Sequence, residues 1–236
     1  NLEPETATTL EAGLNFKADD LWQPGDALRL KAAYFNNDID NYIGLNTSIS
    51  PMTDPSCPYF PCLPPVWTPG GWYVPTCAQY QNYAKGTIDG FEFEGLYDAQ
   101  WMFAGLSISL SNGHTINDDG IRESMITVPP HQATGTLGFR MMENRLTIGG
   151  ELQYNASADY TTLNEDGDLE SYFVGDYTLV NLFASYEANE NFRVDFRVDN
   201  LLNANYESAL NAATLTSPLY EPGITAKIGA TLRFGG

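Results

Sequence analysis

Residues 224–234 place the strongest constraint on the fold, because apolar residues alternate there with residues that are polar or glycine. The apolar set is Ile224, Ala226, Ile228, Ala230, Leu232 and Phe234. Successive side chains of a strand point to opposite faces, whereas a helix would spread this pattern around its whole surface. The segment is therefore predicted to be a strand with one apolar face and one polar face.

The same period of two recurs along the chain and predicts about nine strands. They cover residues 8–17, 27–42, 80–97, 102–111, 133–141, 146–155, 180–186, 192–199 and 224–234. The connections alternate between short and long, and aromatic residues gather beside the short ones. This combination is typical of an outer-membrane β-barrel with apolar residues outward and polar residues inward. We predict an all-β antiparallel meander of a membrane barrel rather than a soluble sandwich.

The charge balance excludes one large class of function. The chain has 30 acidic and 11 basic residues, for a net charge of -19. Nucleic-acid binding needs a basic face, so we expect no nucleic-acid partner. No apolar run reaches the length of about 18 residues that a membrane helix needs. Residues 1–5 lack the basic start and apolar core of a signal peptide, so we expect either a removed signal or a start within a longer protein.

Residues 44–79 form a connection far longer than usual, rich in Pro, Cys and aromatic residues. Its place on the long-connection side predicts an extracellular loop. All three cysteines of the chain, Cys57, Cys62 and Cys77, lie in it, which indicates an oxidising compartment. We expect one disulfide, either Cys57–Cys62 or Cys62–Cys77.

The aromatic side chains of this loop are candidate ligand-binding residues: Tyr59, Phe60, Trp67, Trp72 and Tyr73. Aromatic groups on a loop are unfavourable in water unless they meet a ligand, a partner or one another. One interpretation is an extracellular lip that grips a flat or apolar ligand. The other, which we favour here, is a small self-packed core within the loop.

Several segments resemble the C-terminal part of TonB-dependent outer-membrane receptors. The sequence N-L-E-P-E-T at residues 1–6, followed by L-E-A-G at residues 10–13, is similar to a strand opening of that family. V-D-N-L-L-N-A-N-Y at residues 198–206 resembles its penultimate strand, and P-G at 222–223 with L-R-F at 232–234 resembles its ending. The segments most similar to the haem and haemoglobin receptor branch are residues 28–43, 90–95 and 128–132.

This resemblance implies that residues 1–236 are the C-terminal segment of a barrel of about 22 strands in the bacterial outer membrane, without its plug and upstream strands. The implied function is active import of an iron-containing ligand, with haem first and a siderophore or another nutrient as the alternative. The implied partners are the TonB complex acting through the plug, the remaining strands, and outer-membrane lipid and lipopolysaccharide. Haem or a ferric chelate would be cargo, and no intrinsic cofactor is implied. A separate structural or adhesive barrel is the competing hypothesis, and an odd strand count disfavours it.

The remaining candidates are two histidines and a charged strand. His114 falls in the predicted polar loop 112–130, where it is a candidate ligand of haem iron or simply a solvated side chain, the interpretation we favour. His131 follows Pro-Pro and is interpreted as structural. The alternating Arg and Asp residues of 193–199 are expected to neutralise one another on the lumen face. Residues 164–170 hold several oxygen ligands that could take Ca²⁺, but they lack the full calcium-loop pattern, so we favour a solvated acidic loop. No spacing indicates a zinc site or a nucleophile–base pair, so we do not expect an enzyme.

Overall fold

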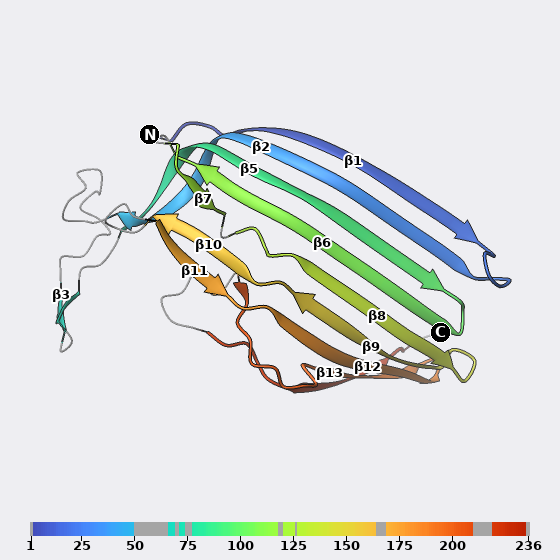
Figure 1. Ribbon diagram of the computed structural model, residues 1–236. Helices are drawn as coiled ribbons and strands as arrows, with labels where there is room; N and C mark the ends of the chain where they lie inside the picture. Colours follow the sequence, from blue (N-terminus) through green and yellow to red (C-terminus); the bar gives the residue numbers. More distant parts are fainter. Residues whose placement is uncertain are drawn as a thin grey trace.

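The computed structural model of the chain describes residues 2–49, 66–68, 71–73, 77–117, 120–125, 127–163, 169–209 and 219–234. One curved antiparallel sheet contains most of them (Figure 1). Within these ranges no helix is long and apolar enough to cross a membrane.

The large sheet contains ten strands, and one of them, β7 (Arg122–Ser124), pairs only with β6. The other nine form a continuous meander, which confirms the predicted number and arrangement. In spatial order they are β1 (Thr6–Asp19), β2 (Ala27–Ile49), β5 (Cys77–Asp98), β6 (Met102–Ile116), β8 (Gln132–Met141), β9 (Leu146–Asn155), β12 (Tyr177–Asn189), β13 (Phe192–Asp199) and β14 (Thr225–Leu232). Two small hairpins stand apart from this sheet, β3 (Val66–Thr68) with β4 (Gly71–Tyr73) and β10 (Ala158–Leu163) with β11 (Leu169–Val174).

Several strands extend further than the alternation predicted. β6 continues to Ile116 and pairs with β7, although residues 112–130 were expected to be a loop. The expected acidic loop 156–176 contains the β10–β11 hairpin. Beyond the apolar band both faces of a strand meet water, so the apolar–polar alternation fades. The backbone ladder does not depend on that alternation and continues.

The predicted division into two faces is confirmed by the exposure of the apolar side chains. Leu106, Leu137, Ile148, Leu182 and Ile228 lie on one face of five strands, with exposed fractions from 39% to 79%. Side chains this apolar and this exposed belong on a surface that meets lipid. The opposite face carries the charged groups.

The two edges of the large sheet remain open. β1 pairs only with β2 and β14 only with β13, and no pairing between β1 and β14 occurs in the described part of the chain. β1 begins at the end of the sheet that carries the long connections, and β14 finishes at the end that carries the tight turns (Figure 1). The expectation that this chain does not close a barrel by itself agrees with this topology.

The turn between β1 and β2 is organised by one buried carboxylate. Asp26 is 2% exposed and accepts backbone N–H hydrogen bonds from Leu21 (2.7 Å), Trp22 (3.0 Å) and Gln23 (3.1 Å). The Tyr97 hydroxyl of β5 donates a fourth hydrogen bond (3.0 Å). Burial alone would raise the pKa of Asp26, but these hydrogen bonds outweigh it and hold the pKa below its ordinary value. The carboxylate therefore fixes the turn in its ionised form and ties it to a neighbouring strand.

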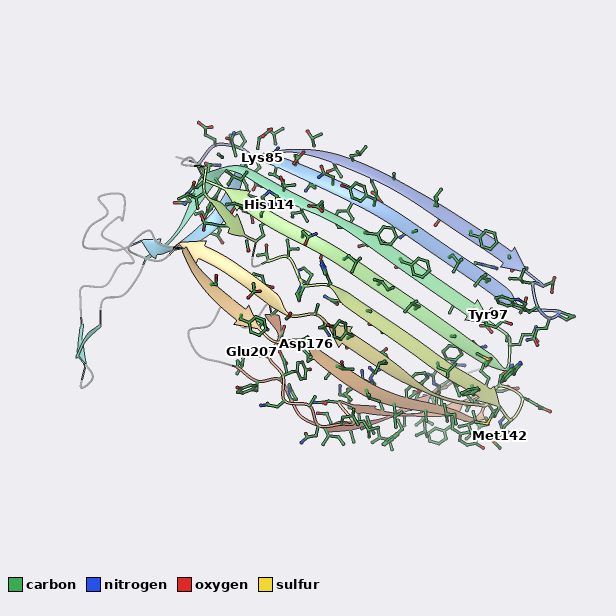
Figure 2. All side chains as sticks on the ribbon, viewed as in Figure 1. Lys85, Tyr97, His114, Met142, Asp176 and Glu207 are labelled. Atoms are coloured by element: carbon green, nitrogen blue, oxygen red, sulfur yellow. The ribbon has the colours of Figure 1, made fainter. Side chains whose placement is uncertain are left out.

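Aromatic side chains line the short-turn end of the sheet, as predicted from their positions beside the short connections. The ring of Tyr97 packs edge-on against Trp22, with centroids 4.9 Å apart. The Arg145 guanidinium lies 5.7 Å from the Tyr186 ring centroid. Figure 2 labels Tyr97 and Met142 at this end of the sheet and Lys85 and His114 at the other. Amphipathic rings at this level match the boundary between hydrocarbon and water.

The turn after β13 depends on Asn200, which is 3% exposed. Its backbone N–H donates to Asn181 Oδ1 (2.9 Å), and its side chain binds the backbone of Ala204 through both a donor and an acceptor (2.9 and 2.8 Å). Asn200 has a φ of 52°, a left-handed conformation that Asn tolerates well. Asn203 repeats the conformation at 51° and accepts a hydrogen bond from the N–H of Ile224. These contacts explain why the segment carries asparagine at positions 200 and 203.

We predict opposite labelling at two adjacent positions of β14. With the native cysteines replaced by Ser and the complete protein in membranes, Ile228→Cys should resist a water-soluble maleimide because it faces lipid. Lys227→Cys should react because it faces the lumen. Equal reactivity would contradict the assignment of faces. Ile228→Arg should destabilise the fold by about 2–4 kcal/mol if it lies near the membrane midplane.

We predict that Asn200→Gly lowers the free energy of unfolding by about 2–3 kcal/mol, because glycine keeps the left-handed backbone but leaves the partly buried N–H and C=O of Ala204 without their side-chain partner. Asn203→Gly is the matched control. It changes the same residue type in the same conformation but removes one exposed hydrogen bond, so its loss should stay below about 1 kcal/mol. Denaturant unfolding in detergent micelles measures both. Similar losses for the two variants would refute a special role for Asn200.

Candidate functional site

The lumen face of β13 carries two ion pairs between residues on the same strand. Arg193 Nη2 lies 2.6 Å from Asp195 Oδ1, and Arg197 Nε donates to Asp199 Oδ1. Side chains two positions apart lie on one face of a strand, which is why the alternating sequence brings them together. The prediction that these charges neutralise one another is confirmed.

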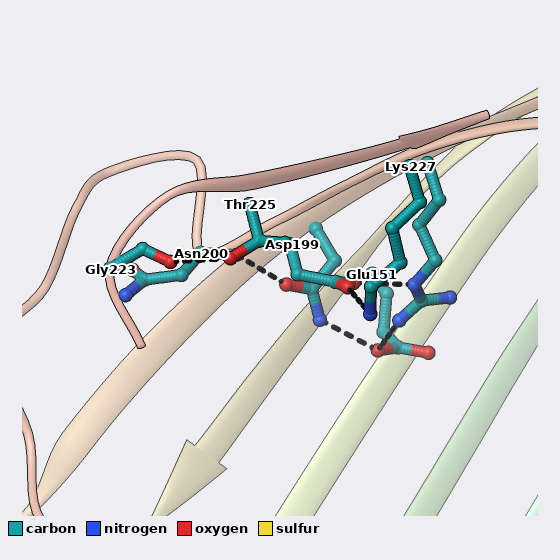
Figure 3. Close-up of polar contacts among 8 residues, drawn as sticks. Glu151, Asp199, Asn200, Gly223, Thr225 and Lys227 are labelled. Atoms are coloured by element: carbon teal, nitrogen blue, oxygen red, sulfur yellow. Dashed lines mark hydrogen bonds and ion pairs between the residues drawn. The ribbon is translucent and has the colours of Figure 1, made fainter. Parts of the chain in front are cut away.

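Further contacts connect this strand to β9 and β14 (Figure 3). Arg197 Nη2 lies 3.4 Å from Glu151 Oε1 of β9, and Lys227 Nζ of β14 lies 2.7 Å from Asp199 Oδ2. Glu151 also accepts a hydrogen bond from Asn181 Nδ2 (2.9 Å). Acidic and basic side chains are paired along this network. It therefore forms a polar wall and offers no unpaired charge among its members to bind a ligand.

An aromatic row interrupts the polar face nearer the tight turns. Phe103 of β6, Gly138 of β8, Gly149 of β9 and Phe183 of β12 are register partners in succession. The two rings stack with centroids 6.4 Å apart, and a Cβ atom at either glycine would collide with a ring. The Arg140 guanidinium covers Phe103, 4.8 Å from its centroid. Sequence reasoning placed Phe103 on the polar face but missed the row, whose only signal was a pair of facing glycines.

The predicted aromatic residues of the long loop are only partly described. Trp67 and Trp72 are register partners in the β3–β4 hairpin, and Val66 pairs with Tyr73. Tyr59 and Phe60 lie outside the described residues, and the loop's ligand-binding role stays a prediction. Of the cysteines, Cys77 begins β5, whereas Cys57 and Cys62 are outside the described residues. The disulfide therefore stays a prediction too.

His114 lies in β6 rather than in a loop, which corrects the sequence-based assignment. It is the register partner of Ser124, because β7 folds back on the end of β6. Arg122, also on β7, places its Nη2 atom 3.0 Å from His114 Nδ1. His114 therefore has a fixed partner and is not simply a solvated side chain.

A cavity of about 420 Å³ lies between this hairpin and the segment that begins β10, at the long-connection end. Both histidines of the chain line it, His114 from β6 and His131 from the residue before β8. The backbone at His131 is fixed by a hydrogen bond from the N–H of Ala156 (2.8 Å). Figure 2 shows His114 beside β7 at this end. The structure thus brings together two histidines that no sequence pattern connects.

Tyr160 of β10 also lines this cavity. Its ring packs with Val174 and Ala209 in a small buried cluster, and the residue is 6% exposed. Its hydroxyl has no hydrogen-bond partner among the described residues. Within the same part of the chain, no group of three or more His, Cys, Asp or Glu residues could hold a metal ion.

Comparison with known proteins agrees with this architecture. Residues 1–201 match the family model of the TonB dependent receptor-like β-barrel. A curated relative, the Heme/hemopexin utilization protein C of Haemophilus influenzae, is 24% identical over 235 residues, which is 99% of this chain and 31% of the relative. The chain thus spans about a third of that relative's length.

Two solved structures have the same fold at low sequence identity. The FrpB iron transporter from Neisseria meningitidis superposes with a TM-score of 0.70 at 16% identity, covering 99% of this chain and 32% of its own. The ferric enterobactin receptor of Pseudomonas aeruginosa superposes with a TM-score of 0.66 at 19% identity, covering 98% and 31%. Likenesses at this level of identity show a shared fold.

The match covers most of the chain, and the sheet has the faces and connections that a barrel in a lipid bilayer requires. The chain therefore belongs to the TonB-dependent receptor-like β-barrel family and is part of the wall of a bacterial outer-membrane β-barrel.

Proposed function

We propose that this chain is the C-terminal part of the barrel of a TonB-dependent receptor that imports an iron-containing ligand, with haem as the first candidate. The observation that carries the proposal is the likeness to the Heme/hemopexin utilization protein C along 99% of the chain. In this proposal a plug and further strands, outside the 236 residues, complete a barrel of about 22 strands.

The described structure supplies what such a transporter needs from its wall. Its exposed apolar face suits lipid, and its lumen face carries matched charges and an aromatic row. The long connections at one end, including residues 44–79, would meet the ligand outside the cell. The tight turns at the other end would lie in the periplasm, where the TonB complex acts on the plug.

A siderophore is the second candidate ligand. It is favoured by the fold shared with the ferric enterobactin receptor, although a likeness at 19% identity bears on the fold alone. A separate adhesive or structural barrel is less well supported, because both edges of the sheet are open and unpaired amides are unfavourable in hydrocarbon.

We predict that a strain lacking the gene fails to grow on haem as sole iron source and still grows on ferrous salts. Growth on a siderophore should be retained if haem is the ligand, and lost instead if the siderophore is. Complementation with the intact gene is the control. Normal growth of the deletion strain on every iron source would end the proposal of iron import.

A further inference from the structure

The cavity between the β6–β7 hairpin and β10 holds features that the wall of a barrel does not need. Its volume of about 420 Å³ falls within the range of about 300–1,000 Å³ that small-molecule sites occupy. It gathers both histidines and one of only 11 basic residues of a strongly acidic chain. The lining side chains that matter for recognition are His114, Arg122, His131 and Tyr160.

Tyr160 provides the first argument. A buried hydroxyl without a partner is destabilising, and native proteins seldom keep one without a reason. Burial raises the pKa of Tyr160, so the hydroxyl keeps its proton at neutral pH. Tyr160 lines the cavity and is 94% buried, so the wall of the cavity includes a residue whose hydroxyl has no partner in the described part of the fold.

His114 and Arg122 provide the second argument. A guanidinium has only donor groups, so its contact with His114 Nδ1 at 3.0 Å makes that nitrogen the acceptor. The proton of the neutral imidazole is then on Nε2. Arg122 fixes the histidine as a second N–H donor and brings a positive charge of its own.

The cavity also has two acidic neighbours, Glu123 and Asp159. Asp159 directly precedes Tyr160 in β10, so the two side chains leave opposite faces of the strand. Asp159 is exposed, whereas Tyr160 is buried. Glu123 follows Arg122 in β7, so these two side chains also leave opposite faces of their strand. Together the N–H and O–H donors of Arg122, His114 and Tyr160 fit an oxyanion.

We propose that this cavity binds a carboxylate of the transported ligand, with Tyr160, His114 and Arg122 donating the hydrogen bonds. His131 stands at the exposed rim as a further donor. The choice of haem, which carries two carboxylates, rests on the proposed function. The assignment of the cavity rests on the geometry. A phosphate from lipid would satisfy similar donors, so the test separates the two sources.

The experiment uses the complete receptor in detergent and two probes, haem and haem dimethyl ester, whose carboxylates are blocked. The variants are Tyr160→Phe and Arg122→Gln. The matched control is Tyr220→Phe, which removes the same hydroxyl from a side chain that is 59% exposed and outside the cavity. Binding is measured by titration of the haem absorbance, and thermal unfolding is recorded for every variant.

Wild type should bind haem at least about tenfold more tightly than the diester, since hydrogen bonds to a charged group have this magnitude. Tyr160→Phe and Arg122→Gln should each weaken haem binding about tenfold and leave diester binding within about twofold. Tyr160→Phe should not lower the melting temperature, because it removes only a hydroxyl that has no partner in the fold. Tyr220→Phe should match wild type for both probes.

Four results would overturn the proposal. The first is equal binding of haem and diester by wild type, a result that contradicts the carboxylate site but not the proposed import of haem. The second is unchanged discrimination in both cavity variants. The third is competition by inorganic phosphate at lower concentration than acetate, which would assign the cavity to a lipid phosphate. A wild-type receptor that binds neither probe would overturn haem as the ligand along with this proposal, and the growth experiment would identify that case independently.

Discussion

Backbone hydrogen bonding is the constraint on which the rest of this structure depends. A strand in hydrocarbon has no water to pair with its N–H and C=O groups, so each must find a partner on a neighbouring strand. From β1 to β14 the meander satisfies this requirement with antiparallel ladders. The pairing register of a ladder determines the face on which each side chain lies. Apolar and polar residues must therefore alternate along the sequence with that register.

The register of the ladders also decides which distant residues become neighbours on the lumen side. Glu151, Asn181 and Asn200 are far apart in sequence, yet two hydrogen bonds connect them across β9, β12 and the turn after β13. In the same way the stacked rings of Phe103 and Phe183 meet over a pair of facing glycines. The polar wall, the aromatic row and the turn after β13 thus all follow from the register of the strand pairing.

The nine-strand meander could be predicted from the sequence because lipid on one side and water on the other enforce a period of two. That period alone assigns Ile228 to the apolar face of its strand. The prediction failed where water lies on both sides, so His114 was placed in a loop and the β10–β11 hairpin was missed. The cavity could not be foreseen either. Packing against Val174 and Ala209 buries Tyr160, and its hydroxyl has no partner in the described part of the fold. No local sequence pattern predicts this packing.

We propose that strands outside this chain complete the wall. Backbone amide hydrogen exchange in the complete protein, in detergent, tests it most directly at the outer edges of β1 (Thr6–Asp19) and β14 (Thr225–Leu232). In each edge strand, the amides that point away from the neighbouring strand need an outside partner. We expect these amides to exchange as slowly as amides in the middle of β6. Exchange as fast as in an unfolded peptide, while β6 stays protected, would show that both edges are free and would contradict it.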